Sequence, residues 1–131
     1  MHGDIMKKVI KVKYHNIFKY EDHQEVIKFD EKGYLEESGN HKIISFMTDK
    51  LIRIEIKTNE IILYNGNSIL RLISGRDVLN QYQTDYGEIS LKTRLIYYEI
   101  GNTIKIKYEL YDGPNLISQV YMMLSYMILE N

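Results

Sequence analysis

The sequence contains no cysteine, no tryptophan and no alanine, and it has a single proline among its 131 residues. Without cysteine the chain cannot form disulfides, use a thiolate nucleophile or bind a metal through sulfur. This composition suits a reducing compartment, and we expect a cytoplasmic protein. The missing alanine bears on the fold, because alanine is the residue that most favours helices.

The chain also lacks long hydrophobic runs and a strong net charge. No stretch reaches the ~20 apolar residues of a membrane-spanning helix. Residues 1–8 contain Asp4 and no long apolar core, so they do not predict a signal peptide. The formal net charge is −1, which provides no basic field to concentrate nucleic acid. We therefore expect neither a membrane nor a nucleic acid as a partner.

Isoleucine and tyrosine are abundant, and both favour strands. Residues 51–57 alternate almost perfectly, with Ile52, Ile54 and Ile56 on one side and charged residues on the other. Residues 88–97 and 104–110 repeat this alternation. No window of helical length shows a convincing 3.6-residue period, although residues 120–129 taken alone also fit a short helix. The composition and the alternation together predict an all-β protein.

Short turn sequences separate the alternating segments. Residues 30–33, Asp-Glu-Lys-Gly, predict a hairpin with Gly33 where a positive φ is needed, and Asn65-Gly66 predicts a type I′ turn. Roughly ten strands joined by such turns leave no room for crossover helices, which predicts an antiparallel up-and-down meander. Because closure removes exposed edges, we expect one β-barrel domain over residues 1–131, with a two-sheet sandwich as the alternative.

Residues 68–93 carry two of these turns, at 74–77 and 85–87, and also a family resemblance. The segment Tyr-Gln-Thr-Asp-Tyr-Gly at residues 82–87, with the alternating run to Thr93, resembles the YwiB-like bacterial family. Gly33, Asn65-Gly66 and the Tyr-Glu-Leu of residues 108–110 fall where that family has similar features, so the resemblance covers nearly the whole chain. It implies a calycin-type barrel similar to lipocalins and fatty-acid-binding proteins, and no established activity.

Three side chains beside the second turn form a candidate site. Tyr82, Thr84 and Tyr86 share a parity and project from one face of a strand end. If that face looks into the barrel, their hydroxyls line its opening and bind a polar ligand group. The alternative is that they are ordinary strand residues whose hydroxyls bind the backbone of the turn.

Arg71 is the fourth candidate ligand-binding residue. It shares its parity with Ile69 and Ile73, so strict alternation places a cation on an apolar face. An arginine inside the barrel would bind a ligand carboxylate or phosphate in bidentate fashion. In the alternative, Leu70 and Leu72 with Ser74 form the inward face and Arg71 lies in solvent.

We predict no catalytic residue, no metal ligand and no cofactor. The four histidines lack the two-apart or four-apart spacing that places two ligands on one face. Neither Ser68 nor Ser74-Gly75 lies in a nucleophile-elbow pattern, and the adjacent Glu36 and Glu37 point to opposite faces of a strand. An enzyme is therefore not the favoured class.

The favoured hypothesis is non-catalytic binding of a small, partly apolar ligand inside the barrel. The competing hypothesis is a solid-cored barrel that acts as a protein-interaction or structural module. Residues 116–129 bear on both, because this segment is apolar on both faces and rich in methionine. It is typical of a central strand, a cavity wall or a homodimer contact. A third hypothesis is an enzyme whose dispersed site leaves no sequence pattern.

Overall fold

The structure is a computed structural model that describes residues 6–130. The predictions for residues 1–5, that they belong to no signal peptide and that His2 binds no metal, fall outside the described residues. The described chain forms ten strands: β1 (Met6–Lys19), β2 (Gln24–Ser38), β3 (His41–Met47), β4 (Leu51–Lys57), β5 (Glu60–Asn65), β6 (Ser68–Ile73), β7 (Val78–Thr84), β8 (Gly87–Glu99), β9 (Thr103–Asp112) and β10 (Asn115–Glu130).

All ten strands belong to one antiparallel sheet with the order β6-β5-β4-β3-β2-β1-β10-β9-β8-β7. Each strand pairs with its neighbours in the chain, except that β6 and β7 form no ladder, and β1 pairs with β10. The predicted all-β, up-and-down barrel of ten strands is therefore confirmed. Within residues 6–130 no helix is long and apolar enough to cross a membrane.

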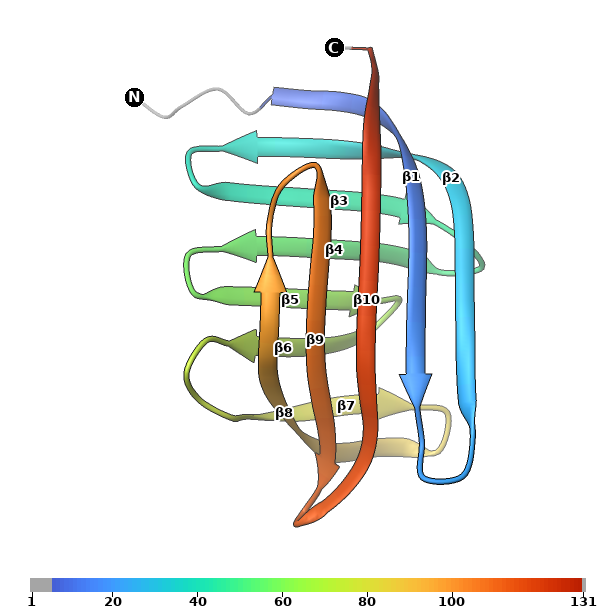
Figure 1. Ribbon diagram of the computed structural model, residues 1–131, viewed down its shortest axis with the longest axis vertical. Helices are drawn as coiled ribbons and strands as arrows, with labels where there is room; N and C mark the ends of the chain where they lie inside the picture. Colours follow the sequence, from blue (N-terminus) through green and yellow to red (C-terminus); the bar gives the residue numbers. More distant parts are fainter. Residues whose placement is uncertain (1–5, 131) are drawn as a thin grey trace.

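The sheet folds over into two layers whose strands cross at a steep angle (Figure 1). Strands β8, β9, β10 and β1 run along the long axis, and β3–β7 run across it behind them. The long strands β2 and β8 belong to both layers, as is usual where sheets meet at a corner. Residues 33–38 of β2 pair with β3, whereas its residues 24–32 pair with β1 alone among the described strands. The first half of β2 therefore has a free edge.

The barrel is closed between β6 and β7 by side chains instead of a strand ladder. The Arg71 backbone N–H donates to Asn80 Oδ1 at 2.8 Å, and Thr93 Oγ1 donates to the Arg71 carbonyl at 2.6 Å. Ser68 Oγ donates to the Gln83 carbonyl at 2.8 Å near the far end. Asn80 and Thr93 thus satisfy backbone groups of β6, and Ser68 satisfies one of β7, that a ladder would otherwise bind. We call this junction the β6–β7 seam.

The hairpin predicted at residues 30–33 is wrong, because β2 continues through these residues without a reversal. Gly33 does not have a positive φ. It is buried where β2 starts to pair with β3, and an added Cβ would lie 2.4 Å from the Ser45 carbonyl oxygen and 3.0 Å from Phe46 Cβ. Gly33 is thus a position of close strand approach, the other common role of glycine in a sheet.

The turn at residues 65–66 is displaced by one position from its prediction. Asn65 pairs with Ser68, so Gly66 and Asn67 are the two turn residues, and of these only Gly66 has a positive φ, of 61°. The hairpin itself is confirmed, as are the reversals at residues 74–77 and 85–87. A positive φ at the first turn residue alone is typical of type II′.

Candidate functional site

The interior of the barrel is solid at one end and hollow at the other. Ile10 and Val12 of β1 pack without exposure against Ile104 and Leu124 of β9 and β10. Further along the same strands, the interior encloses a cavity of about 430 Å³. This volume lies in the range of pockets that hold one small molecule. The cavity is the candidate functional site.

Most of the cavity wall is aromatic or aliphatic. Its apolar residues include Tyr14 and Phe18 of β1, Phe29 of β2, Leu63 of β5, and Tyr108 and Leu110 of β9. The ring of Tyr14 contacts Phe29, at 6.2 Å between centroids, and Phe46, at 5.4 Å. Because these rings hold one another in place, the wall has a fixed shape.

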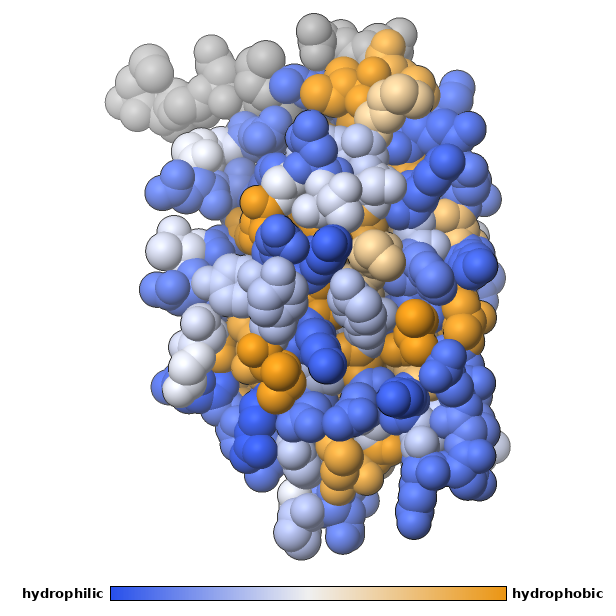
Figure 2. All heavy atoms as spheres, viewed as in Figure 1, coloured by the Kyte–Doolittle hydropathy of each residue, from blue (hydrophilic) through white to orange (hydrophobic). Residues whose placement is uncertain are grey.

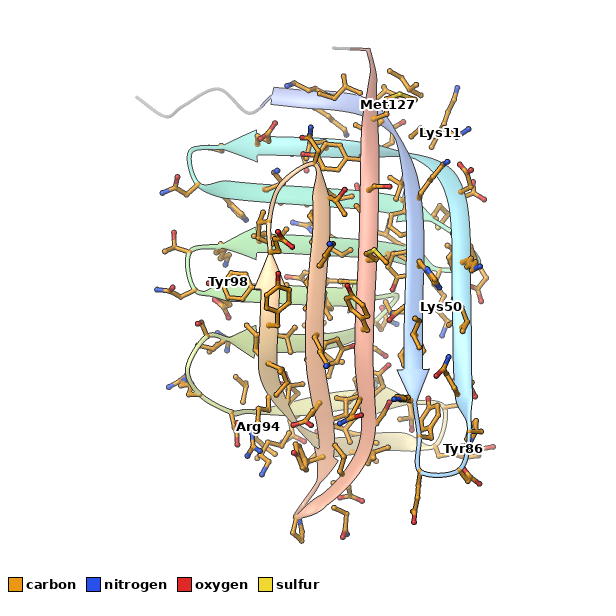
Figure 3. The ribbon with its side chains drawn as sticks, viewed as in Figure 1. Lys11, Lys50, Tyr86, Arg94, Tyr98 and Met127 are labelled. Atoms are coloured by element: carbon orange, nitrogen blue, oxygen red, sulfur yellow. The ribbon has the colours of Figure 1, made fainter. Side chains whose placement is uncertain are left out.

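Exposed wall residues mark the opening of the cavity. They include Ile27 on the free edge of β2, Asp49 and Lys50 in the β3–β4 turn, and Asn65 at the end of β5. Figure 3 shows Lys50 behind β1 and β2, on the side where these turns gather. The charged wall residues are Asp49, Lys50 and Arg53, and two of these belong to the turn. Asp49 and Lys50 therefore lie at the opening, and Arg53 Nη2 donates to Glu55 Oε2 at 3.4 Å on the outer face of β4.

The cavity wall contains a buried polar pair on β1. Asn16 is 5% exposed, and its Nδ2 donates to the Tyr14 hydroxyl at 2.6 Å. Its Oδ1 has no hydrogen-bond partner among residues 6–130. Burial raises the pKa of Tyr14 to about 12, and the bond from Asn16 lowers it in part. Burial likewise raises the pKa of Tyr108, so both phenols stay protonated at neutral pH and can donate.

Tyr82 is the one predicted site residue that lies in the cavity wall. Its side chain is partly buried, packs against the core and borders the cavity. Thr84 and Tyr86, which share its parity in the sequence, do not line the cavity. The Thr84 hydroxyl donates to the Gly87 carbonyl at 2.7 Å and accepts from the Tyr86 backbone N–H at 3.1 Å. Thr84 thus closes the turn, as the alternative interpretation of these hydroxyls has it.

The inward position predicted for Tyr86 is wrong. Its side chain is fully exposed, and Figure 3 shows it at the outer end of the β7–β8 connection. The ladder of β7 and β8 ends with Thr84 opposite Gly87, so Tyr86 lies in the turn, where strand alternation no longer applies.

The inward orientation predicted for Arg71 is also wrong. Leu70 and Leu72 face the core at 7% and 0% exposure, which leaves Arg71 outside. There its Nε donates to Glu60 Oε2 at 2.7 Å. A guanidinium inside the barrel would lose its hydration without this carboxylate, so the outward orientation has the lower free energy.

The sequence-based prediction missed Asn16 and Ser118. Both are buried, at 5% and 2% exposure, and both line the cavity. A signal for Asn16 was present, because it shares its parity with Val12, Tyr14 and Phe18, and a polar residue within an inward apolar row needs a partner. Ser118 lies at a register shift between β9 and β10, which alternation does not predict.

The β1–β2 turn lies beside the opening and contains a charged pair. The Tyr20 ring lines the cavity on one side and stacks on His23 at 4.6 Å between centroids. His23 Nδ1 lies 2.6 Å from Asp22 Oδ1, and this bond raises the pKa of His23 and lowers the pKa of Asp22. The turn therefore contains a pair that is ionised at mildly acidic pH.

We expect the pair to hold the turn most firmly between about pH 4 and pH 6.5, the ordinary pKa values of the two groups. The raised pKa of His23 gives a contribution that is complete below its ordinary value and is lost as the pH rises through the raised one. The lowered pKa of Asp22 gives a contribution that is lost as the pH falls through the lowered value. An NMR titration should show His23 with a midpoint above about 6.5, and Asp22→Asn should return it toward that value. A wild-type midpoint at or below 6.5 would contradict the pairing.

A second polar cluster lies on the outer face of β3–β5. Glu55 is 7% exposed, and four side chains surround its carboxylate: His41 at 3.2 Å, Tyr64 at 3.3 Å, Arg53 at 3.4 Å and Lys57 at 3.6 Å. Burial raises the pKa of Glu55, but Arg53 and Lys57 outweigh it, so the pKa lies below its usual range. The carboxylate is therefore ionised and fully bonded, which suits a structural role better than proton transfer.

The described residues thus form a ten-stranded antiparallel β-barrel with an internal cavity at one end. Comparison with models of known protein families finds no match, and comparison with curated proteins finds none either. Among solved structures, the chain is similar to that titled "Crystal structure of ywiB protein from Bacillus subtilis", with a TM-score of 0.76 and 18% sequence identity. The likeness covers 93% of this chain and 92% of that chain. It shows that the two chains share a fold along almost their whole length.

Proposed function

We propose that this chain is a member of the YwiB-like family and binds one small, partly apolar molecule inside the barrel without catalysing a reaction. The observation that carries the proposal is the cavity of about 430 Å³ with an apolar wall and a buried polar pair. A barrel that served only as a scaffold would fill this end with side chains, as it fills the other. Tyr82 is the predicted anchor that this proposal retains.

Native mass spectrometry of freshly purified protein tests the proposal first. We expect a retained non-protein mass of one small molecule per chain. A neutral fluorescent probe, N-phenyl-1-naphthylamine, tests the cavity independently of the natural ligand. We expect it to bind with one-to-one stoichiometry, because an aromatic wall excludes water and favours an apolar ring.

A cavity-filling substitution locates the probe. Leu63→Trp places an indole in the cavity wall and should weaken probe binding about tenfold or more, because added volume displaces the ligand. Leu79→Trp adds the same ring at a position that is 67% exposed and should leave binding unchanged. Leu110→Trp fills the cavity from β9 and repeats the test if Leu63→Trp folds poorly. Equal probe binding by all variants would place the probe elsewhere and count against the proposal.

The competing function is a protein-interaction module, and one observation favours it. Met127, Ile128 and Leu129, near the end of β10, are between 44% and 61% exposed. Figure 2 shows hydrophobic atoms gathered at this end of the molecule. A self-complementary contact there would give a two-fold homodimer. A dimer with no retained mass and no probe binding would support this function over ligand binding.

A further inference from the structure

The buried pair of Asn16 and Tyr14 restricts the chemistry of the ligand. Asn16 lies in the cavity wall with an oxygen that no described residue binds, although buried polar groups are nearly always hydrogen-bonded. An unpartnered acceptor lowers the stability of the protein, so its presence in an otherwise apolar row requires a reason. A ligand that donates a hydrogen bond to it supplies that reason.

The neighbouring phenol offers the opposite half of a hydrogen-bonding pair. The Tyr14 oxygen accepts from Asn16 Nδ2 at 2.6 Å, so its own proton points elsewhere and is free to be donated. Its raised pKa keeps that proton in place at neutral pH. In this arrangement the pair offers at least one acceptor, Asn16 Oδ1, and at least one donor, the Tyr14 O–H.

The presence of both a donor and an acceptor in this pair does not depend on which way the Asn16 amide is turned. If the Asn16 amide rotates by half a turn, Oδ1 accepts from the Tyr14 hydroxyl and Nδ2 becomes the free donor. The Tyr14 oxygen then keeps a lone pair and becomes the free acceptor. Both orientations present at least one donor and one acceptor side by side.

The placement of charged residues in the cavity wall favours a neutral ligand group beside this pair. The charged residues of the cavity wall, Asp49, Lys50 and Arg53, come from the β3–β4 turn and the adjoining part of β4. A carboxylate bound to the pair would lose part of its hydration, with no cation among the described residues hydrogen-bonded to either side chain. An ammonium group would likewise lack a carboxylate.

We propose that the ligand is a neutral aromatic lactam, or a cyclic amide of the same shape, whose adjacent N–H and C=O bind Asn16 and Tyr14. A planar ring matches the aromatic wall formed by Tyr14, Phe18 and Phe29, and the lactam edge matches the pair. This inference rests on the proposed function, because it names the ligand class for the same cavity.

Three small probes of similar size test the inference by isothermal titration calorimetry: quinolin-2(1H)-one, its N-methyl derivative and 2-naphthoate. The N-methyl derivative lacks the donor, and 2-naphthoate carries an anion. We expect quinolin-2(1H)-one to bind about tenfold more tightly than either, because each of the other two leaves a buried polar group unpaired. Asn16→Leu, which keeps the branched shape of the side chain but removes its polar atoms, should remove the difference between the lactam and its N-methyl derivative. Tyr14→Phe should reduce that difference while keeping the ring.

The outcomes separate this inference from the proposed function. If the lactam and its N-methyl derivative bind equally to the wild type, and Leu63→Trp weakens both, the ligand class is wrong and the cavity remains the binding site. Tighter binding of 2-naphthoate overturns the inference in favour of an anionic ligand held by Lys50 or Arg53. If no probe binds, N-phenyl-1-naphthylamine included, both the inference and the proposed function fail.

Discussion

Replacing Asn80 with alanine is expected to lower the free energy of unfolding by about 3–5 kcal/mol and to open the β6–β7 seam. The Asn80 side chain is 5% exposed, accepts from the Arg71 N–H, and donates to the Val78 and Leu91 carbonyls and to the Thr93 hydroxyl. Alanine leaves several of these groups buried without a partner, and each such group costs roughly 1–3 kcal/mol. Urea denaturation measures the loss, and hydrogen exchange at the Arg71 amide reports opening of the seam.

Two further variants sharpen this test. Thr93→Val removes the donor to the Arg71 carbonyl, and we expect it to couple to Asn80→Ala in a double-mutant cycle, because both side chains bind the same residue of β6. Gln81→Ala is the control on the neighbouring position of β7. Gln81 is exposed and binds only Ser90 across the ladder among the described side chains, so its loss should change stability by less than about 0.5 kcal/mol. If Asn80→Ala were as mild as Gln81→Ala, the seam would not depend on side chains.

The sequence predicted the strands well because each strand has its own alternating pattern. The segment from Leu51 to Lys57 needs no knowledge of its neighbours to be recognised as half-buried. The seam could not be predicted in this way, because Asn80 and Thr93 act on Arg71, which lies in another strand and pairs with neither. A polar residue within a strand becomes informative only once its cross-barrel partner is known.

The candidate site was predicted only in part, for a related reason. On β6, Ile69, Leu70, Leu72 and Ile73 are apolar on both faces, so alternation alone left both orientations of Arg71 open, and the structure has the outward one. Alternation gave the correct inward orientation for Tyr82 because that residue lies within the ladder of β7 and β8. The hollow end of the barrel depends on how side chains from many strands fill the same volume, and the sequence of any one strand does not determine that packing.

Gly33→Ala is the second substitution with a large expected effect, a loss of about 3 kcal/mol in the free energy of unfolding. The added methyl group would lie 2.4 Å from the Ser45 carbonyl oxygen, 3.0 Å from Phe46 Cβ and 3.3 Å from Val12 Cγ2. The nearest of these is backbone of β3, which pairs with both β2 and β4 and has little freedom to move. Gly33 opposes Phe46 at the first pair of the β2–β3 ladder, so the strain falls where the two layers join. Thermal and urea unfolding should both show the loss.

Gly101→Ala is the matched control, because it adds the same methyl group in the β8–β9 turn. There the nearest atom is 3.8 Å away and the backbone φ does not require glycine. We expect this variant to be unchanged or more stable by about 0.4–1 kcal/mol, since alanine reduces the freedom of the unfolded chain. A Gly33→Ala protein as stable as Gly101→Ala would show that β3 moves aside without cost. The layers would then be held together by the core alone, and Gly33 would have no role in bringing β2 close to β3.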